Sequence, residues 1–461
     1  MSNQFSFGDD IIPTESLKGK KILFANFPAD GHFNPLTGLA VYLKNLGCDV
    51  RWYASGLYAD KLEKLNIPHY PFKKALEVRG DNLETLFPER NKIKGQMKKL
   101  KFDMINVFIL RCAEYYADLL EIQRSFPFEL LVADCAFSGI PFVKEKMNIP
   151  VVSIGVFPLT ETSADLPPAG LGMTPSRNLI GRMKQSLLRA ITRKLIFGGP
   201  NRVMWQILDK HNIPHNRESI FDMLITKSTV MLQSGTPGFE YERSDLSRHI
   251  HFIGALLPYS ASKKRIPWFD DRLTQYEKII LVTQGTVEKD PEKILVPTLE
   301  AFKDSDTLVV VTTGGSKTPE LRRRFPHSNI IIEDFIPFGD IMPYADVYIT
   351  NGGYGGVMLG IENELPLVVA GVHEGKNEIN ARIGYFDLGI NLKTERPKES
   401  RIKNAVETVI NNKKYKANVI RLAKEFSRYN PGALTANHVA EVLQRSGLLY
   451  FSAPRVEEKI Y

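Results

Sequence analysis

The segment 346–382 constrains the fold of this chain more than any other part of it. It opens with the short apolar run 346–350, whose β-branched and aromatic residues are typical of a buried strand. The sequence NGGYGG follows at 351–356, then an apolar pattern with helical spacing at 357–363 and a strand pattern at 365–370. A strand that enters a helix through a glycine turn presents free N–H groups and the positive end of the helix dipole to an anion. We therefore consider two interpretations, a phosphate or pyrophosphate site and a tight turn without a ligand.

A longer ordered pattern continues after this turn. Asn351 and its glycines are followed by Pro366, by EGKN at 374–377 and by NAR at 380–382. The whole pattern resembles the donor-binding signature of the family 1 glycosyltransferases with the GT-B fold. In that family a His or Asn, a pair of glycines and a helix N-terminus hold the diphosphate of a nucleotide sugar. The segment matches neither the P-loop nor the G-x-G-x-x-G dinucleotide fingerprint.

Length, charge and cysteine content narrow the class of protein. A chain of 461 residues is long enough for two domains, and no apolar run approaches the ~20 residues of a membrane span. The polar start lacks the features of a signal peptide, and three cysteines without metal-ligand spacing indicate a reducing compartment. The net charge of +8 is spread along the chain and suits small anionic ligands better than nucleic acid. We expect a cytoplasmic protein without a metal or cofactor, as a monomer or weak homodimer.

The N-terminal part predicts a parallel sheet wound with helices. Residues 1–18 are expected to form a loose arm. Strand patterns at 21–27 and 49–54 flank a helical pattern at 36–46, and the residues 28–35 between them are predicted to form a loop. This βαβ beginning is typical of an α/β domain.

His32 and Asp134 are the candidate catalytic residues. In a parallel sheet, ligands meet the loops at the carboxyl ends of the strands, and His32 follows the first strand. Asp134 ends the apolar strand 130–134 and is expected at the same edge. A histidine base needs a partner that fixes its tautomer, while an Asp at this position can also cap a helix. The loop sequence FPADGHFNP resembles the first loop of the same glycosyltransferase family, whose His is the general base.

The resemblance implies the fold and the domain division. It predicts a GT-B fold, with two facing Rossmann-like parallel-sheet domains and a deep cleft between them. Residues 1–257 would form the acceptor-binding domain, 258–275 a linker and 276–430 the donor-binding domain. Residues 431–461 would form a helix and tail that cross back to the first domain.

The resemblance also assigns the ligand-binding residues. Phe335 would stack on the nucleobase, in place of the Trp of relatives. The donor site would contain Gly31, Gln284, Gly285, Thr286, Thr313, Phe335, Pro337, Phe338, Asn351, Gly352, Gly353, Tyr354, Gly355, Gly356, Val357, Glu374, Gly375, Lys376 and Asn377. The walls for an apolar acceptor would be Phe33, Phe157, Leu159, Leu166 and Met173.

A second, weaker signal comes from the basic and partly amphipathic segment 177–208. A helix of this kind can lie on a membrane surface. It can equally belong to the acceptor-binding domain, with its polar face exposed to solvent. The second interpretation is preferred, so membrane binding is not expected.

Several departures from the family pattern bear on the donor. Within the family the chain is most similar to bacterial flavonoid O-rhamnosyltransferases. Asn351 replaces the usual His, and Gly356 replaces a Ser or Thr. Leu359 stands where UDP-sugar enzymes carry a Glu that binds the ribose hydroxyls, which fits a deoxyribose donor such as a dTDP-sugar. The usual sugar-binding carboxylate pair falls on Gly375 and Lys376, which suits a 6-deoxy sugar, although Glu374 and Asn377 could substitute.

Together these features predict an inverting O-glycosyltransferase that moves L-rhamnose from dTDP-β-L-rhamnose to a hydroxyl of a flavonoid-like acceptor. His32 would be the general base and Asp134 its partner. One alternative is a UDP-glucosyltransferase that acts on macrolides, terpenoids or lipids. Another is a non-catalytic protein that binds nucleotide sugars.

Overall fold

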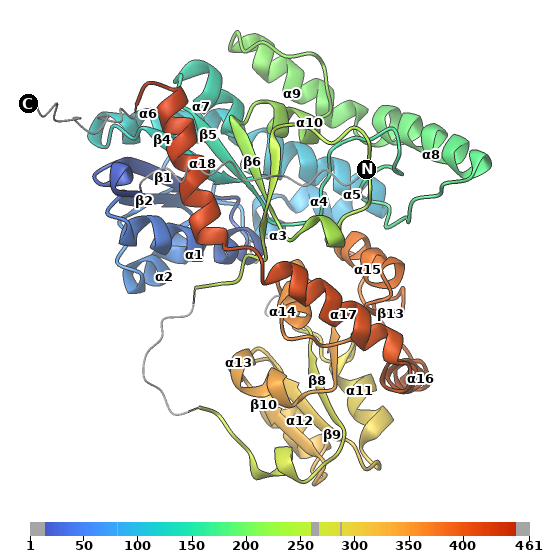
Figure 1. The fold of residues 1–461 in the computed structure, drawn as a ribbon. Helices are drawn as coiled ribbons and strands as arrows, with labels where there is room; N and C mark the ends of the chain where they lie inside the picture. Colours follow the sequence, from blue (N-terminus) through green and yellow to red (C-terminus); the bar gives the residue numbers. More distant parts are fainter. Residues whose placement is uncertain (1–13, 81, 260–266, 286–287, 449–461) are drawn as a thin grey trace, which may run out of the picture.

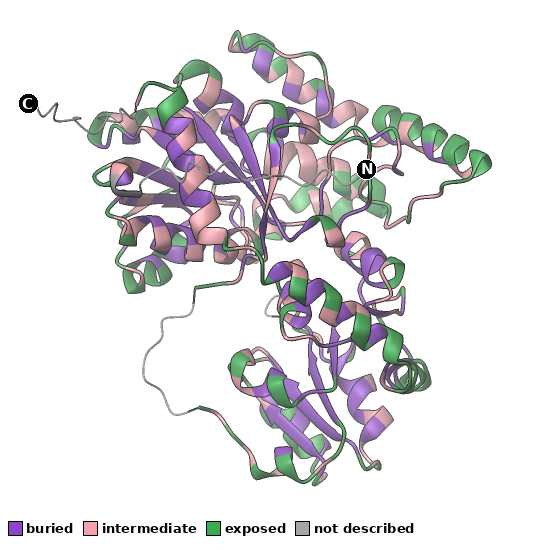
Figure 2. Cartoon of the chain, viewed as in Figure 1, coloured by how far each residue is buried: buried purple, intermediate pink, exposed green. Residues whose placement is uncertain are grey.

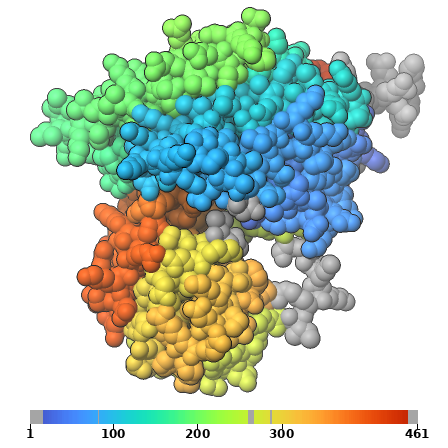
Figure 3. Space-filling model, turned by 180° about the vertical axis from the view of Figure 1, so that it is seen from behind, coloured from blue at the N-terminus to red at the C-terminus, as the bar shows by residue number. Residues whose placement is uncertain are grey.

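The computed structural model describes residues 14–80, 82–259, 267–285 and 288–448, and these residues form two stacked lobes (Figure 1). Each lobe is built on one sheet, and all strand pairs within each sheet are parallel. The prediction of two Rossmann-like parallel-sheet domains is therefore confirmed. Figure 3 shows the same lobes from behind, meeting at a narrow waist.

The upper lobe contains a seven-stranded sheet with helices on both faces. Its strands, in spatial order, are β3 (His69–Pro71), β2 (Asp49–Ala54), β1 (Lys21–Ala25), β4 (Leu130–Asp134), β5 (Val151–Gly155), β6 (Val230–Ser234) and β7 (Ile250–Gly254). Its helices are α1 (Asp30–Asn45), α2 (Ala59–Lys64), α3 (Leu83–Leu86), α4 (Pro88–Lys92), α5 (Gln96–Asp103), α6 (Arg111–Ser125), α7 (Ile140–Lys146), α8 (Leu179–Ile191), α9 (Gly198–Lys210) and α10 (Ile220–Thr226). Short π-helical turns at Met104–Ile109 and Thr192–Ile196 follow α5 and α8.

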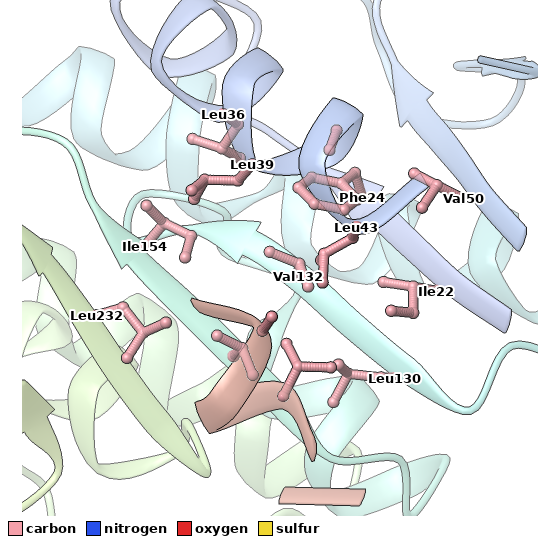
Figure 4. Close-up of a cluster of buried hydrophobic side chains, with 14 of the residues drawn as sticks. Ile22, Phe24, Leu36, Leu39, Leu43, Val50, Leu130, Val132, Ile154 and Leu232 are labelled. Carbon is pink, nitrogen blue, oxygen red and sulfur yellow. The ribbon is translucent and has the colours of Figure 1, made fainter. Parts of the chain in front are cut away.

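Burial on both faces explains why the inner strands β1, β4, β5 and β6 are mostly apolar. Successive side chains of a strand point to opposite faces, so Ile22 and Phe24 of β1 enter one core cluster and Leu23 and Ala25 the other. Figure 4 shows the first cluster, where the β1 and β4 side chains meet the apolar stripe of α1. This packing fixes the end of β1, and with it the residues that follow.

The lower lobe repeats the design with six strands. In spatial order they are β10 (Ile330–Glu333), β9 (Leu308–Thr312), β8 (Ile279–Thr283), β11 (Val347–Thr350), β12 (Leu367–Val369) and β13 (Gly389–Asn391). Its helices are α11 (Leu295–Phe302), α12 (Thr318–Arg324), α13 (Phe338–Ile341), α14 (Tyr354–Glu362), α15 (Lys376–Tyr385), α16 (Glu399–Asn411) and α17 (Lys413–Phe426). Most strands are buried in both lobes, whereas the outer sides of most helices are exposed (Figure 2).

The last helix, α18 (Pro431–Arg445), leaves the lower lobe and lies across the upper one (Figure 1). Pro431 occupies its first turn, and the side chain of Asn430 accepts a hydrogen bond from the Ala433 N–H, which caps the helix. Val439 and Leu443 are buried in the same core cluster as β1 and α1. The C-terminal helix therefore belongs to the core of the upper lobe.

The structure corrects two local predictions and leaves part of another outside its range. Helix α1 begins at Asp30, inside the predicted loop, because Phe33 and Leu36 pack into the core and this burial outweighs the turn-forming residues. The predicted loose arm is ordered from Thr14, and Leu17 is buried. Residues 260–266 of the predicted linker, like residues 1–13, lie outside the described residues. Within the described ranges, no helix combines the length and apolar character needed to cross a bilayer.

Candidate active site

His32 and Asp134 lie side by side at the carboxyl edge of the upper sheet. β1 and β4 are neighbours, so the residues that follow β1 come close to the end of β4. His32 lies in the first turn of α1, and its Nδ1 is 2.7 Å from Oδ1 of Asp134. Asp134 is fully buried, whereas 20% of the His32 side chain is exposed. The expected proximity of these two side chains is present in the structure.

The surroundings of Asp134 determine which nitrogen of His32 carries the proton. The carboxylate accepts hydrogen bonds from the Phe27 N–H at 2.6 Å and the Ala136 N–H at 2.8 Å. A carboxylate in this network only accepts, so Nδ1 of His32 must donate to it. The lone pair of Nε2 is then free to accept a proton. Asp134 thus holds the turn after β4 and orients His32. It does not cap a helix, because the next helix, α7, begins at Ile140 and its N-cap residue is Gly139.

Aromatic rings enclose the imidazole on two sides. The ring centroids of Phe27 and Phe157 lie 5.3 Å and 5.9 Å from that of His32. Both contacts are edge-on, so the rings restrict the rotation of the imidazole. Gly31, in the same first turn, is exposed, and a Cβ atom there would meet no atom within 4 Å. The predicted base therefore lies next to an exposed residue without a side chain.

The glycine turn between β11 and α14 is held by the side chain of Asn351. Its Nδ2 donates a hydrogen bond to the carbonyl of Gln284, and its Oδ1 accepts one from the Gly353 N–H at 3.2 Å. Gly352 has a φ of +83°, and a Cβ atom there would lie 1.8 Å from the side-chain oxygen of Asn380. Only glycine fits at this position. The amide of Asn351 thus links the turn to the end of β8.

The first turn of α14 provides the N–H groups that a diphosphate requires. In an α-helix the first N–H groups have no acceptor within the helix, which leaves those of Tyr354, Gly355 and Gly356 available to a ligand. Val357 does not belong to this set. Its N–H is bonded to the Gly353 carbonyl at 3.0 Å and its side chain is fully buried, so its predicted donor contact is wrong.

The side chain of Tyr354 points to the other lobe. Its hydroxyl donates a 2.7 Å hydrogen bond to the carbonyl of Ser234, at the end of β6. Burial raises the pKa of this hydroxyl far above its ordinary value, so it stays protonated as a donor. Tyr354 therefore has only its backbone available to a sugar donor, while its hydroxyl forms a hydrogen bond between the two lobes.

The turn after β8 lies against the glycine turn. Gly285 has a φ of +78°, and a Cβ atom there would lie 3.6 Å from the Asn351 amide. Gln284 is fully buried, and its Nε2 donates to the Asp290 carbonyl at 2.9 Å. Its side chain is thus an internal brace, and only its backbone faces the turn. Thr286 lies outside the described residues.

Thr313 does not fulfil its predicted role. It is fully buried, and its hydroxyl is bonded to that of Thr318 and accepts the Gly315 N–H at 3.2 Å. The hydroxyl holds the glycine turn after β9 and is not open to a donor. Sequence position alone could not show this, because the acceptor of the hydroxyl comes from the next helix.

Phe335 is suited to stack on a base. Its ring is 68% exposed, and a Cβ atom on Gly315 would lie 3.7 Å from it. The ring and the glycine turn therefore form a flat, open surface. Pro337 is exposed nearby, whereas Phe338 packs against the core of the lobe, 6.3 Å from the ring of Tyr348. Phe338 thus supports this surface from inside.

The residues around the start of α15 form an ion pair with each other and a contact with the upper lobe. Glu374 is exposed and its carboxylate is 2.6 Å from the ammonium of Lys376. Gly375, with a φ of +78°, begins the helix. Asn377 donates its amide to the Gly170 carbonyl at 2.8 Å in the upper lobe. Lys376 is therefore the cation nearest the glycine turn in this segment, and Asn377 contributes to the contact between the lobes.

The predicted acceptor walls separate into three groups. Phe157 lies beside His32, as described above. Leu159, Leu166 and Met173 line a cavity of about 440 Å³ between the loop after β5, the α8–α9 region and α15. Phe33 is fully buried and stacks on Tyr58 at 4.0 Å, so its predicted acceptor contact is wrong. His32 does not line the cavity, although Leu159 is only two residues from Phe157.

Two polar groups in this cavity were missed by the sequence analysis. The hydroxyl of Tyr241 and Nη2 of Arg243 are buried and have no hydrogen-bond partner among the described residues. Burial lowers the pKa of Arg243 from its ordinary value, and Glu161 and Glu240 partly oppose this. Buried polar atoms normally find a partner, so two of them in one cavity indicate a place for a ligand oxygen or water.

Comparisons with known proteins place this geometry in a family. Residues 297–440 match the family model described as Erythromycin biosynthesis protein CIII-like, C-terminal domain. The chain is 32% identical over 409 residues to 4'-demethylrebeccamycin synthase of Lentzea aerocolonigenes, covering 89% of this chain and 96% of that protein. The chain belongs to the family 1 glycosyltransferases. This membership confirms the resemblance seen in the donor signature and the enzyme class that it implied.

Two further comparisons concern the family 1 glycosyltransferases more broadly. UDP-glucosyltransferase 1 of Beauveria bassiana (strain ARSEF 2860) is 29% identical over 446 residues, covering 90% of this chain and 93% of that protein. The structure of spinosyn rhamnosyltransferase SpnG with thymidine diphosphate has a TM-score of 0.63 at 12% identity, covering 91% of this chain and 99% of SpnG. At that identity the second match supports the GT-B fold alone.

Proposed function

We propose that this glycosyltransferase is an inverting rhamnosyltransferase that moves L-rhamnose from dTDP-β-L-rhamnose to a hydroxyl of a flavonoid-like aromatic acceptor. The observation that carries the proposal is the 2.7 Å contact between His32 Nδ1 and the buried Asp134 carboxylate. With Nδ1 bonded to Asp134, Nε2 of His32 remains as a proton acceptor, and the neighbouring Gly31 is exposed to solvent. The Asp134 charge would stabilise the imidazolium that forms.

The transfer would be a single displacement. Nε2 of His32 takes the proton of the acceptor hydroxyl, and the hydroxyl oxygen forms a bond with the anomeric carbon while the bond to the diphosphate breaks. Attack from the opposite face inverts a β-L-rhamnosyl donor into an α-L-rhamnoside. The departing dTDP would meet the N–H groups of Tyr354, Gly355 and Gly356 and the positive end of α14. Lys376 adds a nearby positive charge that Asn351 lacks.

The nucleotide preference rests on α14. Leu359 lies one turn beyond Gly355 on the same helical face, is half-buried and packs against the core of the lower lobe. A hydrocarbon side chain offers no acceptor to a ribose 2′-hydroxyl, and burying an unpaired hydroxyl costs about 1–3 kcal/mol. A deoxyribose avoids that cost. The base would stack on the exposed Phe335 ring.

The body of the acceptor would occupy the cavity lined by Leu159, Leu166 and Met173. Its volume of about 440 Å³ lies in the range of small-molecule sites. Leu159 is two residues from Phe157, so the cavity begins within ~7 Å of the backbone of a residue that touches the base. A carbonyl or hydroxyl oxygen of the acceptor would satisfy the Tyr241 hydroxyl and the Arg243 guanidinium.

A second candidate function is transfer of glucose from UDP-glucose, since a relative at 29% identity is UDP-glucosyltransferase 1 of Beauveria bassiana. The discriminating experiment compares turnover of quercetin with dTDP-β-L-rhamnose and with UDP-glucose. Turnover with dTDP-rhamnose alone supports the proposal, and preference for UDP-glucose contradicts the argument from Leu359. If neither donor gives product while dTDP binds, quercetin is the wrong acceptor or the protein is a non-catalytic binder. A wider acceptor panel separates those two cases.

A further inference from the structure

Helix α8 has its apolar side chains on the outside of the molecule. Ile180, Met183 and Leu187 follow the spacing of one helical face and are 81%, 65% and 62% exposed. The same exposed stripe includes Leu179, Ile191 and Leu195. Figure 2 shows α8 exposed along most of its length at the edge of the upper lobe. Contiguous exposed apolar surface of this kind usually marks a site of interaction.

The inward face of α8 is polar and well bonded. Gln185 is the buried residue of the helix, and its Oε1 accepts the Ser176 N–H at 2.8 Å. Asn178 caps the helix by accepting the Gly181 N–H at 2.7 Å. Rotating α8 to bury its apolar stripe would break the contacts of Gln185. The helix therefore exposes its apolar stripe together with its basic residues, as the expectation of a solvated polar face requires, and this differs from an ordinary surface helix, whose apolar face is buried.

Positive charge accompanies the apolar stripe. The segment 179–196 contains five basic residues and no acidic residue. Lys184 and Lys194 are exposed, as are Arg182 and Arg193. A helix with an exposed apolar stripe and flanking cations lies in the interface of an anionic bilayer, where apolar burial and charge attraction add.

We propose that α8 and the π-helical turn after it dock this enzyme on an anionic lipid surface. The charge distribution favours lipid over a second copy of the chain. In a symmetric dimer, segment 179–196 of one copy would lie against the same segment of the other copy. The basic residues of the two copies would then repel each other, because neither segment contains an acidic residue. The proposal does not depend on the donor, the acceptor or the base.

Docking at α8 would also place the cavity near the lipid. Arg189 and Ala190, at the C-terminal end of α8, line the cavity, and Arg189 donates to the Leu166 carbonyl at 2.5 Å. A molecule that partitions into the bilayer could then reach the cavity without crossing bulk water. This would be an advantage for an apolar acceptor.

Vesicle flotation of the full chain tests the proposal. The probes are vesicles of phosphatidylcholine alone and vesicles with about one quarter phosphatidylglycerol, at low and high salt. We expect binding to the anionic vesicles that weakens with salt, and little binding to the neutral ones. We expect a decrease in the bound fraction of at least about tenfold in each of two variants. Ile180→Ser/Leu187→Ser removes apolar surface that would be buried in the bilayer, and Lys184→Glu/Lys194→Glu reverses two of the charges that attract anionic lipid.

Matched variants show whether the effect is local. Leu120→Ser/Leu246→Ser changes two exposed leucines elsewhere, and Lys210→Glu/Lys424→Glu makes the same charge change at distant exposed sites. Both should bind like the wild type. Absence of wild-type flotation, or equal loss in the matched variants, would overturn the proposal. A second result would also overturn it: the wild type binds no vesicles but forms a dimer in light scattering, and Ile180→Ser/Leu187→Ser abolishes that dimer.

Discussion

The guanidinium of Arg382, on α15 of the lower lobe, pairs with the carboxylate of Glu240 in the upper lobe at 2.7 Å. Both side chains are buried, with 2% and 5% exposed. Burial opposes the charge of Arg382, but the attraction of Glu240 outweighs it and the pKa of the guanidinium stays above its ordinary value. The other oxygen of Glu240 accepts the Leu159 N–H at 2.9 Å. The Glu240 carboxylate thus connects the lower lobe to Leu159, a residue of the cavity wall.

Arg382→Met should reduce the free energy of unfolding by about 3–5 kcal/mol, because it removes the close partner of the buried Glu240 carboxylate and leaves only Arg243, at 4.0 Å. The double variant Arg382→Met/Glu240→Met should recover part of that loss. Denaturant unfolding followed by circular dichroism measures both. Arg324→Met, which breaks an exposed pair with Glu292, is the control and should cost about 1 kcal/mol or less. Equal effects of Arg382→Met and Arg324→Met would contradict the role of the buried pair.

Leu359→Glu should shift nucleotide preference toward UDP-sugars. A carboxylate at this position offers the ribose hydroxyls an acceptor, and a gain of about 1–3 kcal/mol changes the ratio of dTDP to UDP affinity by roughly tenfold to a hundredfold. Calorimetric titration with the two nucleotides measures the ratio without any acceptor. Leu359→Met keeps the apolar character and should leave the ratio unchanged. An unchanged ratio in Leu359→Glu would show that the ribose does not approach this residue.

Tyr241→Phe and Arg243→Met should raise the KM for the acceptor and leave the KM for the donor unchanged. Removing one hydrogen-bond donor costs about 0.5–1.5 kcal/mol for a neutral group and more for a charged one, so a few-fold and roughly tenfold increases are expected. Arg202→Met changes an exposed Arg of α9 and serves as the control. If acceptor KM stays constant in both variants, the acceptor does not use this cavity.

Sequence patterns located several strands and the contact between His32 and Asp134. The bounds of β2 and β4 agree with the strands predicted at 49–54 and 130–134, because a buried parallel strand is a mostly apolar run that ends at turn residues. The pairing of His32 with Asp134 followed from the rule that parallel strands end at one edge. The rule requires only that His32 follows one apolar strand and that Asp134 ends another, and both facts can be read from the local sequence.

Other features depend on contacts that no local pattern contains. Phe33 and Thr313 lie within motifs of ligand-binding loops, yet tertiary packing buries both. The cavity joins the loop after β5, the α8–α9 region, Tyr241 and Arg382, which are far apart in the chain. Gln185 of α8 is buried because the loop around Ser176 and Asp165 bonds its side chain. Such arrangements become visible only in the folded structure.

Acid should loosen the docking of α18 on the upper lobe. The rings of His251 on β7 and His438 on α18 lie 4.7 Å apart. Burial lowers the pKa of both histidines. The charge of His251 lowers the pKa of His438 further, and His249 lowers that of His251. Arg445 lowers both pKa values, whereas Glu441 partly raises them. Below the ordinary His pKa of about 6.5 the unfolded chain binds more protons than the folded one, so stability falls as pH falls.

The melting temperature measured between about pH 7.5 and about pH 5.5 tests this effect. His251→Gln/His438→Gln should show a smaller decrease over that range than the wild type, since it removes both titrating groups. His373→Gln, a change at an exposed histidine that does not act on this pair, should behave like the wild type. A decrease that is the same in all three proteins would assign the pH dependence to other groups.

The most direct test of the central claim is single-turnover kinetics of His32→Ala beside equilibrium binding of dTDP. A general base contributes about 10²–10⁴-fold, so the rate of sugar transfer should fall by that factor while the dTDP affinity stays within about twofold of wild type. His249→Ala, a change at an exposed histidine, should retain the wild-type rate. Transfer by His32→Ala at the wild-type rate would contradict the assignment of His32 as the base. Equal losses of transfer and dTDP binding would instead indicate a structural role for His32.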